Sequence, residues 1–506
     1  MAVNFFKKRK ESEILSAYKN YELAEELNLL GYNYHYGTYG KEINYTKAYE
    51  HFLRSAELGN AKGEYNLGLC YYNGKGVEKD LYEAFKWYKK SAEQGDAMAQ
   101  CNLGYCYEHG EGVEKDFFEA VKWYKLSAEQ GDAMAQNNLG CCYENGNGVK
   151  QDFSEAAKWY KLSAEQGNSH AQSNIGSLYY NGKGVNKDLS EAFKWYKKSA
   201  EQGNAMARCN LGYCYEHGEG VEKDFFEAVK WYKLSTEQGN AMAQNNLGCC
   251  YENGNGVKQD FFEAFKWYKL SAEQGNSHAQ SNIGSLYYNG KGVNKDLSEA
   301  FKWTKLSAKQ GYERAQLNLG YHYEAGKGVS KDLSEAFKWY KLSAKQGNAK
   351  AQCNLGSFYY NGKGVKQDLP EAFKWYKLSA EQGNARAQCN LAYCYYSGKG
   401  VEKDVYEAFK WYRLSAKQGY PTAQFNVGYC YKYGIGVEKD FFEAVKWYKL
   451  SAEQGFASAQ CNLGICYKNG EGVEKDEKKA IELLSKAVAQ GVKEAEEELR
   501  ELKGGH

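Results

Sequence analysis

Apolar residues recur along this chain at the spacing of an amphipathic helix, and they do so twice in every 36 residues. In one such stretch a first stripe runs from Ala99 through Leu103 to Tyr107, at positions i, i+4 and i+8. A second stripe with the same spacing runs from Ala120 to Ala128. This periodicity places each stripe on one face of a helix. The pattern therefore predicts pairs of helices joined by a turn.

Polar residues and glycines mark the expected ends of these helices. Gly110 follows the first stripe as a plausible C-cap. Asp116 is placed to N-cap the second helix, and Glu119 would complete a capping box with it. The two prolines of the chain, Pro370 and Pro421, fall in predicted first turns, where a missing N–H does no harm.

One sequence motif, which we call the phrase, repeats along nearly the whole chain. The glycine of its Leu-Gly pair recurs every 36 residues from Gly68 to Gly464, with Ala392 in its place once. An irregular earlier copy contains Gly31, which brings the count to thirteen units. A fixed period of this length is typical of stacked units that cannot each bury their own core. We expect an all-α protein, a right-handed α/α superhelical solenoid of about thirteen 36-residue helix-turn-helix repeats.

The ends of the chain depart from the phrase, as solenoid caps do. We expect residues 1–22 to form an N-terminal extension and capping helix, and residues 23–491 to form the solenoid. Residues 492–506 should form a C-terminal capping helix and tail. In this last segment Glu498 and Arg500 stand in the Asn and Gly positions of the phrase. A bulky charge at the glycine position predicts a helix that faces solvent.

Composition narrows the possible functions. Lys plus Arg total 66 and Asp plus Glu total 64, so net charge near zero argues against non-specific nucleic-acid binding. No run of about 20 apolar residues occurs, so no membrane span is expected. The first residues lack an apolar stretch of signal-peptide length, which favours a soluble, cytoplasmic protein. The run Lys7–Lys10 resembles a nuclear-localisation patch, or else belongs to a solvated terminus, and Gly504–His506 has the composition of a loose tail.

Residues that could carry chemistry do not gather into a site. The 15 cysteines contain no CxxC, and Cys101 and Cys106 lie five residues apart, on different sides of a helix. We expect reduced, semi-buried thiols. The histidines form no pair at helical ligand spacing. Ser and Asp residues recur at fixed positions of the repeat, and we call each such position a column. None of them departs from its column as a catalytic residue would. We therefore expect no catalytic residue, no metal and no cofactor.

Part of the repetition reflects duplication. Residues 96–203 and 204–311 differ at nine of 108 positions. Similarity between these copies can be recent ancestry, so we give more weight to what persists from Leu317 onward.

The full frame is A-Q-x-N-L-G-x-x-Y-x-x-G-x-G-V-x-K-D-x-x-E-A-x-K-W-Y-x-x-S-A-x-Q-G. It resembles the Sel1-like repeat, a relative of the tetratricopeptide repeat with a longer turn between its helices. The resemblance implies an α/α superhelical solenoid and adaptors that hold proteins together. A cysteine-rich secreted branch of that family is stapled by disulfides and has been linked to penicillin binding. The uneven cysteine distribution here departs from that branch.

Variation within the fixed frame marks a candidate recognition strip on the first helix. Residues 101, 105 and 108 share one side of that helix and change from unit to unit. A tolerant solvent-facing strip would vary in the same way, so both interpretations stay open. The strip is acidic and aromatic over most of its length, with Lys432 and Lys468 near its end. A ligand with some basic character is mildly favoured.

An Asn column borders this strip and occupies every regular unit. By resemblance to tetratricopeptide proteins, this position lines a concave groove, where an amide can both donate to and accept from a peptide backbone. The alternative is a ladder of Asn bonds between neighbouring helices, and both can hold. The residues predicted to bind peptide are Asn102, Asn138, Asn174, Asn210, Asn246, Asn282, Asn318, Asn354, Asn390, Asn426, Asn462, Tyr105, Tyr213, Tyr321, Tyr393 and Tyr429.

A Trp column, from Trp87 to Trp447, follows the same period on the second helix. It could stack a ligand, but eleven copies at one packing position favour a core between repeats.

These patterns predict a non-catalytic scaffold or adaptor that binds an extended peptide segment of another protein in its concave groove. One alternative is an enzyme or small-molecule binder related to the cysteine-rich branch. The other is a single-stranded RNA binder, since some helical repeats of about 35 residues read one base each.

Overall fold

The chain folds entirely into helices. The computed structural model describes the backbone of residues 2–504 and the side chains of residues 16–504, and between residues 2 and 504 it contains 27 helices and no strand. The basic patch at Lys7–Lys10 and the tail residues Gly505 and His506 lie outside the described side chains. None of the helices within the described range is both long and apolar enough to cross a bilayer. The predicted all-α repeat fold is confirmed.

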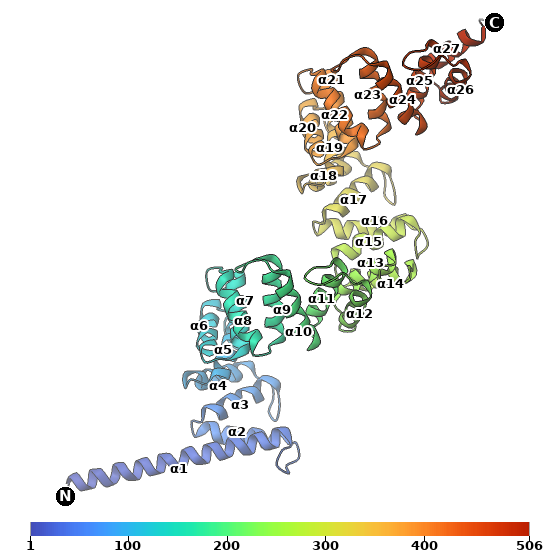
Figure 1. Cartoon of the computed structure of the whole chain (residues 1–506). Coiled ribbons are helices and arrows are strands. Elements are labelled where there is room, and N and C mark those ends of the chain that lie inside the picture. Colours follow the sequence, from blue (N-terminus) through green and yellow to red (C-terminus); the bar gives the residue numbers. More distant parts are fainter. Residues whose placement is uncertain (1, 505–506) are drawn as a thin grey trace. The chain divides into compact units, whose positions relative to one another are not determined.

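The chain divides into two compact units, Met1–Gln259 and Asp260–His506. In the first unit each helix packs on the next in chain order (Figure 1). Its helices are α1 (Ala2–Tyr36), α2 (Tyr45–Glu57), α3 (Ala61–Asn73), α4 (Leu81–Glu93), α5 (Ala97–His109), α6 (Phe117–Glu129), α7 (Ala133–Asn145), α8 (Phe153–Glu165), α9 (Ser169–Asn181), α10 (Leu189–Glu201), α11 (Ala205–His217), α12 (Phe225–Thr236) and α13 (Ala241–Asn253).

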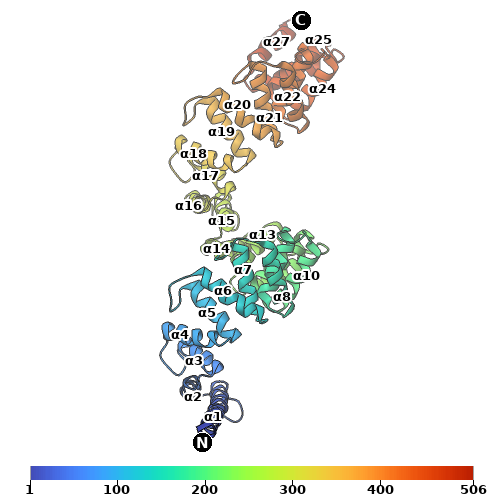
Figure 2. The ribbon, with the colours of Figure 1, turned by 90° about the vertical axis from the view of Figure 1, so that its left-hand side faces the viewer.

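The second unit repeats this arrangement, and successive helices again lie side by side (Figure 2). Its helices are α14 (Phe261–Glu273), α15 (Ser277–Asn289), α16 (Leu297–Lys309), α17 (Glu313–Ala325), α18 (Leu333–Lys345), α19 (Ala349–Asn361), α20 (Leu369–Glu381), α21 (Ala385–Ser397), α22 (Val405–Lys417), α23 (Pro421–Tyr433), α24 (Phe441–Glu453), α25 (Ala457–Asn469), α26 (Glu477–Ala489) and α27 (Lys493–Gly504). We call the odd-numbered helices α3 to α25 the A helices and the even-numbered helices α4 to α26 the B helices.

The two apolar stripes form the core, as predicted. On α5, Ala99 and Leu103 have no exposed surface, and on α6 Ala120 and Tyr124 are likewise fully buried. Trp123 packs against the core cluster built by the preceding repeat on α4 and α5. The prediction that the Trp column is core between repeats is confirmed.

The glycine of the Leu-Gly pair lets the B helix approach the A helix. A Cβ on Gly104 would lie 2.7 Å from Cδ1 of Tyr124, and one on Gly320 would lie 2.6 Å from Cδ1 of Tyr340. Real Cβ atoms do not come this close to a ring, so glycine leaves the space that the buried tyrosine fills.

The G-x-G of the turn is structural and has two separate causes. Gly110 ends α5 in the left-handed conformation, with φ 74° and its N–H bonded to the carbonyl of Cys106. Gly112 also has positive φ, and a Cβ there would lie 2.1 Å from the carbonyl oxygen of Leu81 in the preceding repeat. The first glycine caps a helix, and the second allows the turn to rest on the neighbouring repeat.

The N-cap of the B helix is as predicted, but the capping box is not. The Asp116 carboxylate accepts from the backbone N–H groups of Phe118 and Glu119. The N–H of Asp116 donates to the carbonyl of Tyr107 instead, at 2.9 Å. Glu119 is left to pair with Lys122, 3.1 Å away on the surface.

A polar contact that the sequence did not reveal joins each repeat to the one before. Gln100 is 5% exposed, and its amide donates to the carbonyl of Ala92 in the preceding B helix. The same side chain accepts from Gln130, at 2.8 Å, the C-cap residue of the B helix in its own repeat. The carbonyl of Ala92 also accepts from the N–H of Gly95, at 3.0 Å, so the glutamine of the Ala-Gln pair adds a second donor to it and links the two repeats.

Candidate functional site

The predicted peptide-binding residues lie together on one side of the A helices. The Asn side chains are half-buried, except Asn462, which is buried. Tyr105 and Tyr429 are also half-buried, while Tyr213, Tyr321 and Tyr393 are exposed. The Asn and Tyr columns therefore share a partly solvent-accessible face, which we call the A face. The first residue of the predicted recognition strip, in contrast, is buried in most repeats, as at Cys101 and Cys353.

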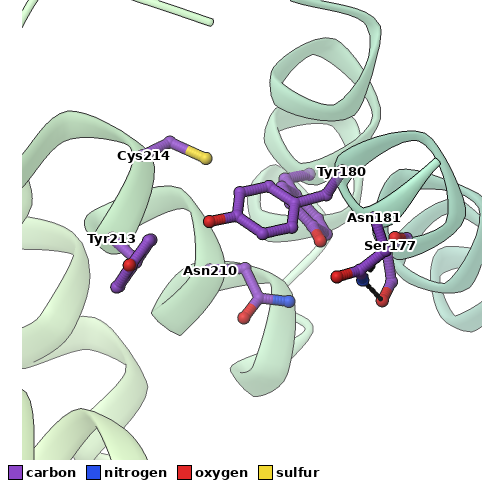
Figure 3. A pocket seen from close by; sticks show the side chains of 7 residues that line it. Ser177, Tyr180, Asn181, Asn210, Tyr213 and Cys214 are labelled. Atoms are coloured by element: carbon purple, nitrogen blue, oxygen red, sulfur yellow. Dashed lines mark hydrogen bonds between the residues drawn. The ribbon is translucent and has the colours of Figure 1, made fainter. Parts of the chain in front are cut away.

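The A face of the first unit contains a hollow of about 330 Å³ between α9 and α11. Ser177 and Tyr180 line it from α9, Tyr196 forms its floor from the B helix α10, and Asn210 and Tyr213 line it from α11. Tyr180 and Tyr213 point into the space between their helices (Figure 3). The hollow is thus built from the predicted Asn and Tyr columns, together with Tyr180.

The same hollow recurs in the second unit at positions 180 residues later. It measures about 210 Å³ and is lined by Ser357, Tyr360, Tyr376, Asn390 and Tyr393. The recurrence shows that the hollow is a property of this combination of column residues.

The column that holds Glu108, Tyr180, Glu324 and Tyr360 contributes differently to this space from repeat to repeat. Where it holds Glu, the buried tyrosine of the B helix donates to it: Tyr124 to Glu108 and Tyr340 to Glu324, both at 2.7 Å. Where it holds Tyr180 or Tyr360, the same space is lined by that aromatic ring instead. The sequence shows that this column varies but does not reveal its hydrogen bond to the buried tyrosine. The alternation between Glu and Tyr was the available signal.

Tyrosines from successive A helices meet at their edges. The rings of Tyr180 and Tyr213 are 6.4 Å apart at an interplanar angle of 78°, and those of Tyr360 and Tyr393 are 6.5 Å apart at 65°. Edge contacts of this kind are favourable and leave the ring faces available.

A third hollow continues the surface in the second unit. It measures about 200 Å³ between α21 and α23 and is lined by Tyr393, Tyr396, Tyr412, Phe425 and Tyr429, with Asn426 and Cys430. Tyr393 belongs to both this hollow and the preceding one. The A face of α19, α21 and α23 therefore carries adjoining aromatic hollows.

The Asn column makes ladder contacts at some positions. Asn174 donates to Asn137 in the preceding repeat at 3.1 Å, and Asn66 donates to Asn28 at 2.8 Å. Asn210 and Asn390 line hollows. The Asn side chain therefore bonds to a neighbouring helix at some positions and lines a hollow at others.

The two cations expected near the end of the strip are engaged within the chain. Lys432 is 9% exposed and lies 3.8 Å from Glu471. Lys468 contacts both Glu498 and Glu501, each at 2.6 Å. These ion pairs link the last repeats to one another. Since both lysines are paired within the chain, neither presents an unpaired charge to a ligand.

The cysteines are free thiols, and all but Cys141 and Cys249 are buried. Burial is the main cause that raises the pKa of the Cys106 thiol to about 12, and the nearby Glu111 carboxylate adds to it. Such thiols are poor nucleophiles. Within the described residues, no three His, Cys, Asp or Glu side chains gather into a metal-binding group.

Comparisons with known proteins agree on the family. The Sel1 repeat model matches thirteen consecutive segments that together cover residues 21–492: 21–60, 61–96, 97–132, 133–168, 169–204, 205–240, 241–276, 277–312, 313–348, 349–384, 385–420, 421–456 and 457–492. A search of curated proteins found no match.

Solved structures similar to the chain include two Sel1-like repeat proteins. One is c5321, a protective antigen present in uropathogenic Escherichia coli strains and displaying an SLR fold. It is 37% identical, with a TM-score of 0.68, and the match covers 87% of this chain and 95% of that one. The other is a Sel1 repeat protein from Oxalobacter formigenes, 34% identical with a TM-score of 0.47, covering 60% of this chain and 88% of that one. This chain belongs to the Sel1 repeat family.

Proposed function

We propose that this protein is a non-catalytic scaffold that binds an extended segment of another protein along its A face. Repeats of this fold generally mediate contacts between proteins, so the family favours this class of function. The observation that carries the proposal is the recurrence of one hollow, lined by the Asn and Tyr columns, in both units.

The chemistry of the hollows suits a peptide. An Asn amide offers a donor and an acceptor, and so matches a backbone peptide group whatever side chain that residue carries. Tyrosine rings offer flat apolar faces with a polar edge, which bury a partner's side chains at small cost in conformational entropy. Asn390 and Tyr393 provide both elements within one hollow. The hollows would then act as successive subsites along one segment.

The proposal places the protein in a reducing compartment, with the cytoplasm as the simplest assignment. Fifteen free thiols, most of them inside the helix stack, are typical of proteins that do not meet an oxidising environment.

The experiment uses a library of random 16-residue peptides displayed on phage and selected on the full-length protein. Binding of the enriched peptides is then measured by fluorescence anisotropy with the wild type and with the triple variant Asn318→Ala, Asn354→Ala and Asn390→Ala. Each lost backbone contact should weaken binding by about 0.5–1.5 kcal/mol, so the triple variant should bind more than about tenfold more weakly. Its melting temperature should hold, because Ala favours helix more than Asn does.

The matched control changes three exposed lysines on the B helices of the same repeats, Lys338→Ala, Lys374→Ala and Lys410→Ala. Each lies on the surface and pairs with the glutamate three residues before it. These changes should leave peptide binding intact. Failure to enrich any peptide, or equal affinity of the triple Asn variant, would contradict the proposal. A lower melting temperature with intact binding would assign the Asn column to the ladder.

A further inference from the structure

The A face of the second unit contains a hollow that differs in charge from the tyrosine hollows. It measures about 390 Å³ and is lined from α17, α19 and the start of α21. Its lining residues are Leu317, Asn318, Tyr321, Lys350, Cys353, Asn354, Asn384 and Arg386. Two cations and three amides face this space, and no carboxylate is among its lining residues.

Its two cations are not neutralised by the chain. Neither Lys350 nor Arg386 forms an ion pair within residues 16–504, although the lysines of the neighbouring B helices do. Glu324 on α17 is already engaged, since it accepts from Tyr340 and lies 3.9 Å from Lys363. The hollow therefore has an uncompensated positive charge in a protein whose net charge is close to zero.

Arg386 is held in position. Its Nε lies 3.2 Å from the sulfur of the buried Cys353, and its terminal nitrogen donates to the side-chain oxygen of Asn354. A guanidinium fixed by two contacts loses less freedom when it binds an anion. Asn354 belongs to the Asn column, so the cation and a predicted backbone-binding amide form one unit.

Three consecutive cations lie in one part of a repeat column, in which Lys62 of the first unit is also a cation. The second residue of the A helix is Arg314, Lys350 and Arg386 in three consecutive repeats of the second unit. In the first unit the same position holds Met98 and Met134, both exposed. Helix packing does not require a cation at this position, because methionine occupies it elsewhere with the same helices around it.

We propose that this hollow binds a carboxylate of the partner, so that the segment on the A face is acidic where it crosses α17, α19 and α21. The inference rests on the proposed function and names the chemistry of one of its subsites. Arg386 and Lys350 bind the carboxylate, Asn318 and Asn354 bind the adjoining peptide group, and Leu317 and Tyr321 cover the aliphatic part of the acidic side chain. Arginine suits this role, since its planar fork matches a carboxylate with two parallel hydrogen bonds.

This changes the expectation drawn from the sequence, which mildly favoured a basic ligand. The glutamates on which that expectation depended are partly occupied, because Glu108 and Glu324 accept from buried tyrosines. The cations of this hollow, in contrast, lie at positions that the recognition strip did not include.

The test uses the same displayed-peptide selection, run in parallel on the wild type, on Lys350→Gln with Arg386→Gln, and on a matched control. The control is Met98→Gln with Met134→Gln, which alters the same two repeat positions in the first unit. We expect Asp and Glu to be enriched on the wild type and on the control, and the enrichment to vanish on the charge-removed variant. An acidic peptide should lose roughly tenfold or more in affinity on that variant.

Two synthetic forms of the best peptide identify the source of the carboxylate. One carries Asn or Gln in place of each Asp or Glu, and the other carries an amidated C-terminus. Loss of binding in the first form assigns a side-chain carboxylate, and loss only in the second assigns the chain end. Loss of binding in the first form supports the proposal. Loss only in the second form, or binding of both forms as tight as that of the unmodified peptide, overturns it.

The outcomes separate this inference from the proposed function. If peptides are enriched without any acidic preference, or if they bind the charge-removed variant unchanged, the carboxylate subsite is wrong while the scaffold function stands. If no peptide is enriched, the scaffold function fails as well. Preferential binding of a fluorescein-labelled uridine 12-mer at low salt, lost in the charge-removed variant, would overturn the proposal in favour of a phosphate ligand.

Discussion

Two equivalent buried cysteines, one in each unit, lie in the same local fold but beside side chains of opposite charge. Cys101 in the first unit corresponds to Cys353 in the second, seven repeats later, and both are buried. Burial raises the pKa of the Cys101 thiol, and the neighbouring Asp132 carboxylate raises it further. Burial also raises the pKa of the Cys353 thiol, but there the Arg386 guanidinium acts in the opposite direction.

The difference shows that some columns of the repeat pack the helices together, while others vary on the exposed surface. The glycine and glutamine columns keep the same contacts at both places, and the ring of the buried tyrosine packs on the glycine at both, because these contacts hold the helices together. The residues that change, such as Met134 against Arg386, lie on the A face and are exposed. We therefore expect changes in the packing columns to have equal effects in both units, and changes on the A face to have unequal effects.

The largest expected effect is that of overpacking the glycine column. Gly104→Leu and Gly320→Leu should each destabilise the local repeats by about 3 kcal/mol, because the added side chain collides with Tyr124 or Tyr340. Hydrogen exchange measured peptide by peptide should show lost protection near each site and little change elsewhere, since stacked repeats couple mainly to their neighbours.

Ala392 supplies the control for that experiment, because this repeat carries a Cβ naturally. Gly320→Ala should cost less than Gly320→Leu. Unchanged protection in either Leu variant would show that the tyrosine does not pack on the glycine, and a large difference between the two units would break the equivalence of the packing columns.

Removing the buried glutamine should have the next largest effect. Gln136→Leu and Gln352→Leu each remove two hydrogen bonds: the one donated to a carbonyl of the preceding B helix, which keeps its backbone N–H donor, and the one accepted from the glutamine that pairs with them. We expect a loss of about 2 kcal/mol in each unit, measured as local protection against exchange.

Replacement by Arg should be much milder. Arg208 occupies this column naturally, and its Nε keeps the bond to the carbonyl of Ala200. Gln136→Arg as damaging as Gln136→Leu would show that the column acts through its shape and not through this hydrogen bond.

A smaller loss of stability should distinguish repeats with Glu in the column of Glu324 from repeats with Tyr in that column. Tyr340→Phe removes the donor of a 2.7 Å hydrogen bond to Glu324, and we expect it to cost about 1.5 kcal/mol. Tyr376→Phe removes only a 3.1 Å contact with Ser357 at the floor of a hollow, and should cost about 0.5 kcal/mol. Equal losses in thermal melts of the two variants would remove the distinction that we draw between these repeats.

The smallest expected effect is on the reactivity of the thiols, which tests the opposite charges beside Cys101 and Cys353. Thiol counting on the denatured, unreduced protein should find all 15 cysteines. In the folded protein, alkylation followed by peptide mapping should label the half-buried Cys141 and Cys249 first. Among the buried thiols, Cys353 should react faster than Cys101, because a cation favours its thiolate.

Arg386→Gln should slow the labelling of Cys353 by about threefold and leave Cys101 unchanged, since the pKa of the Cys353 thiol rises when the cation is lost. A faster reaction of Cys353 in that variant would mean that Arg386 protects the thiol by covering it.

Much of the fold was readable from the sequence because it depends on local signals. The 36-residue period, the two apolar stripes and the caps at Gly110 and Asp116 each involve residues within one or two helical turns. The capping box failed for a local reason of another kind: the N–H of Asp116 is taken by the carbonyl of Tyr107, a competition that the motif alone does not reveal.

The candidate site was only half readable. The sequence determined that Asn and Tyr columns would share one face of the A helices, because helical spacing alone places them there. Only the tertiary structure decided three contacts. The ring of Tyr180 contacts that of Tyr213 on the next A helix, Tyr124 donates a hydrogen bond to Glu108, and the sulfur of Cys353 holds the guanidinium of Arg386. These contacts join residues 16 to 33 positions apart, so their geometry depends on how one helix packs on the next. The period predicts that the helices stack, while the packed side chains decide which columns remain open to a partner.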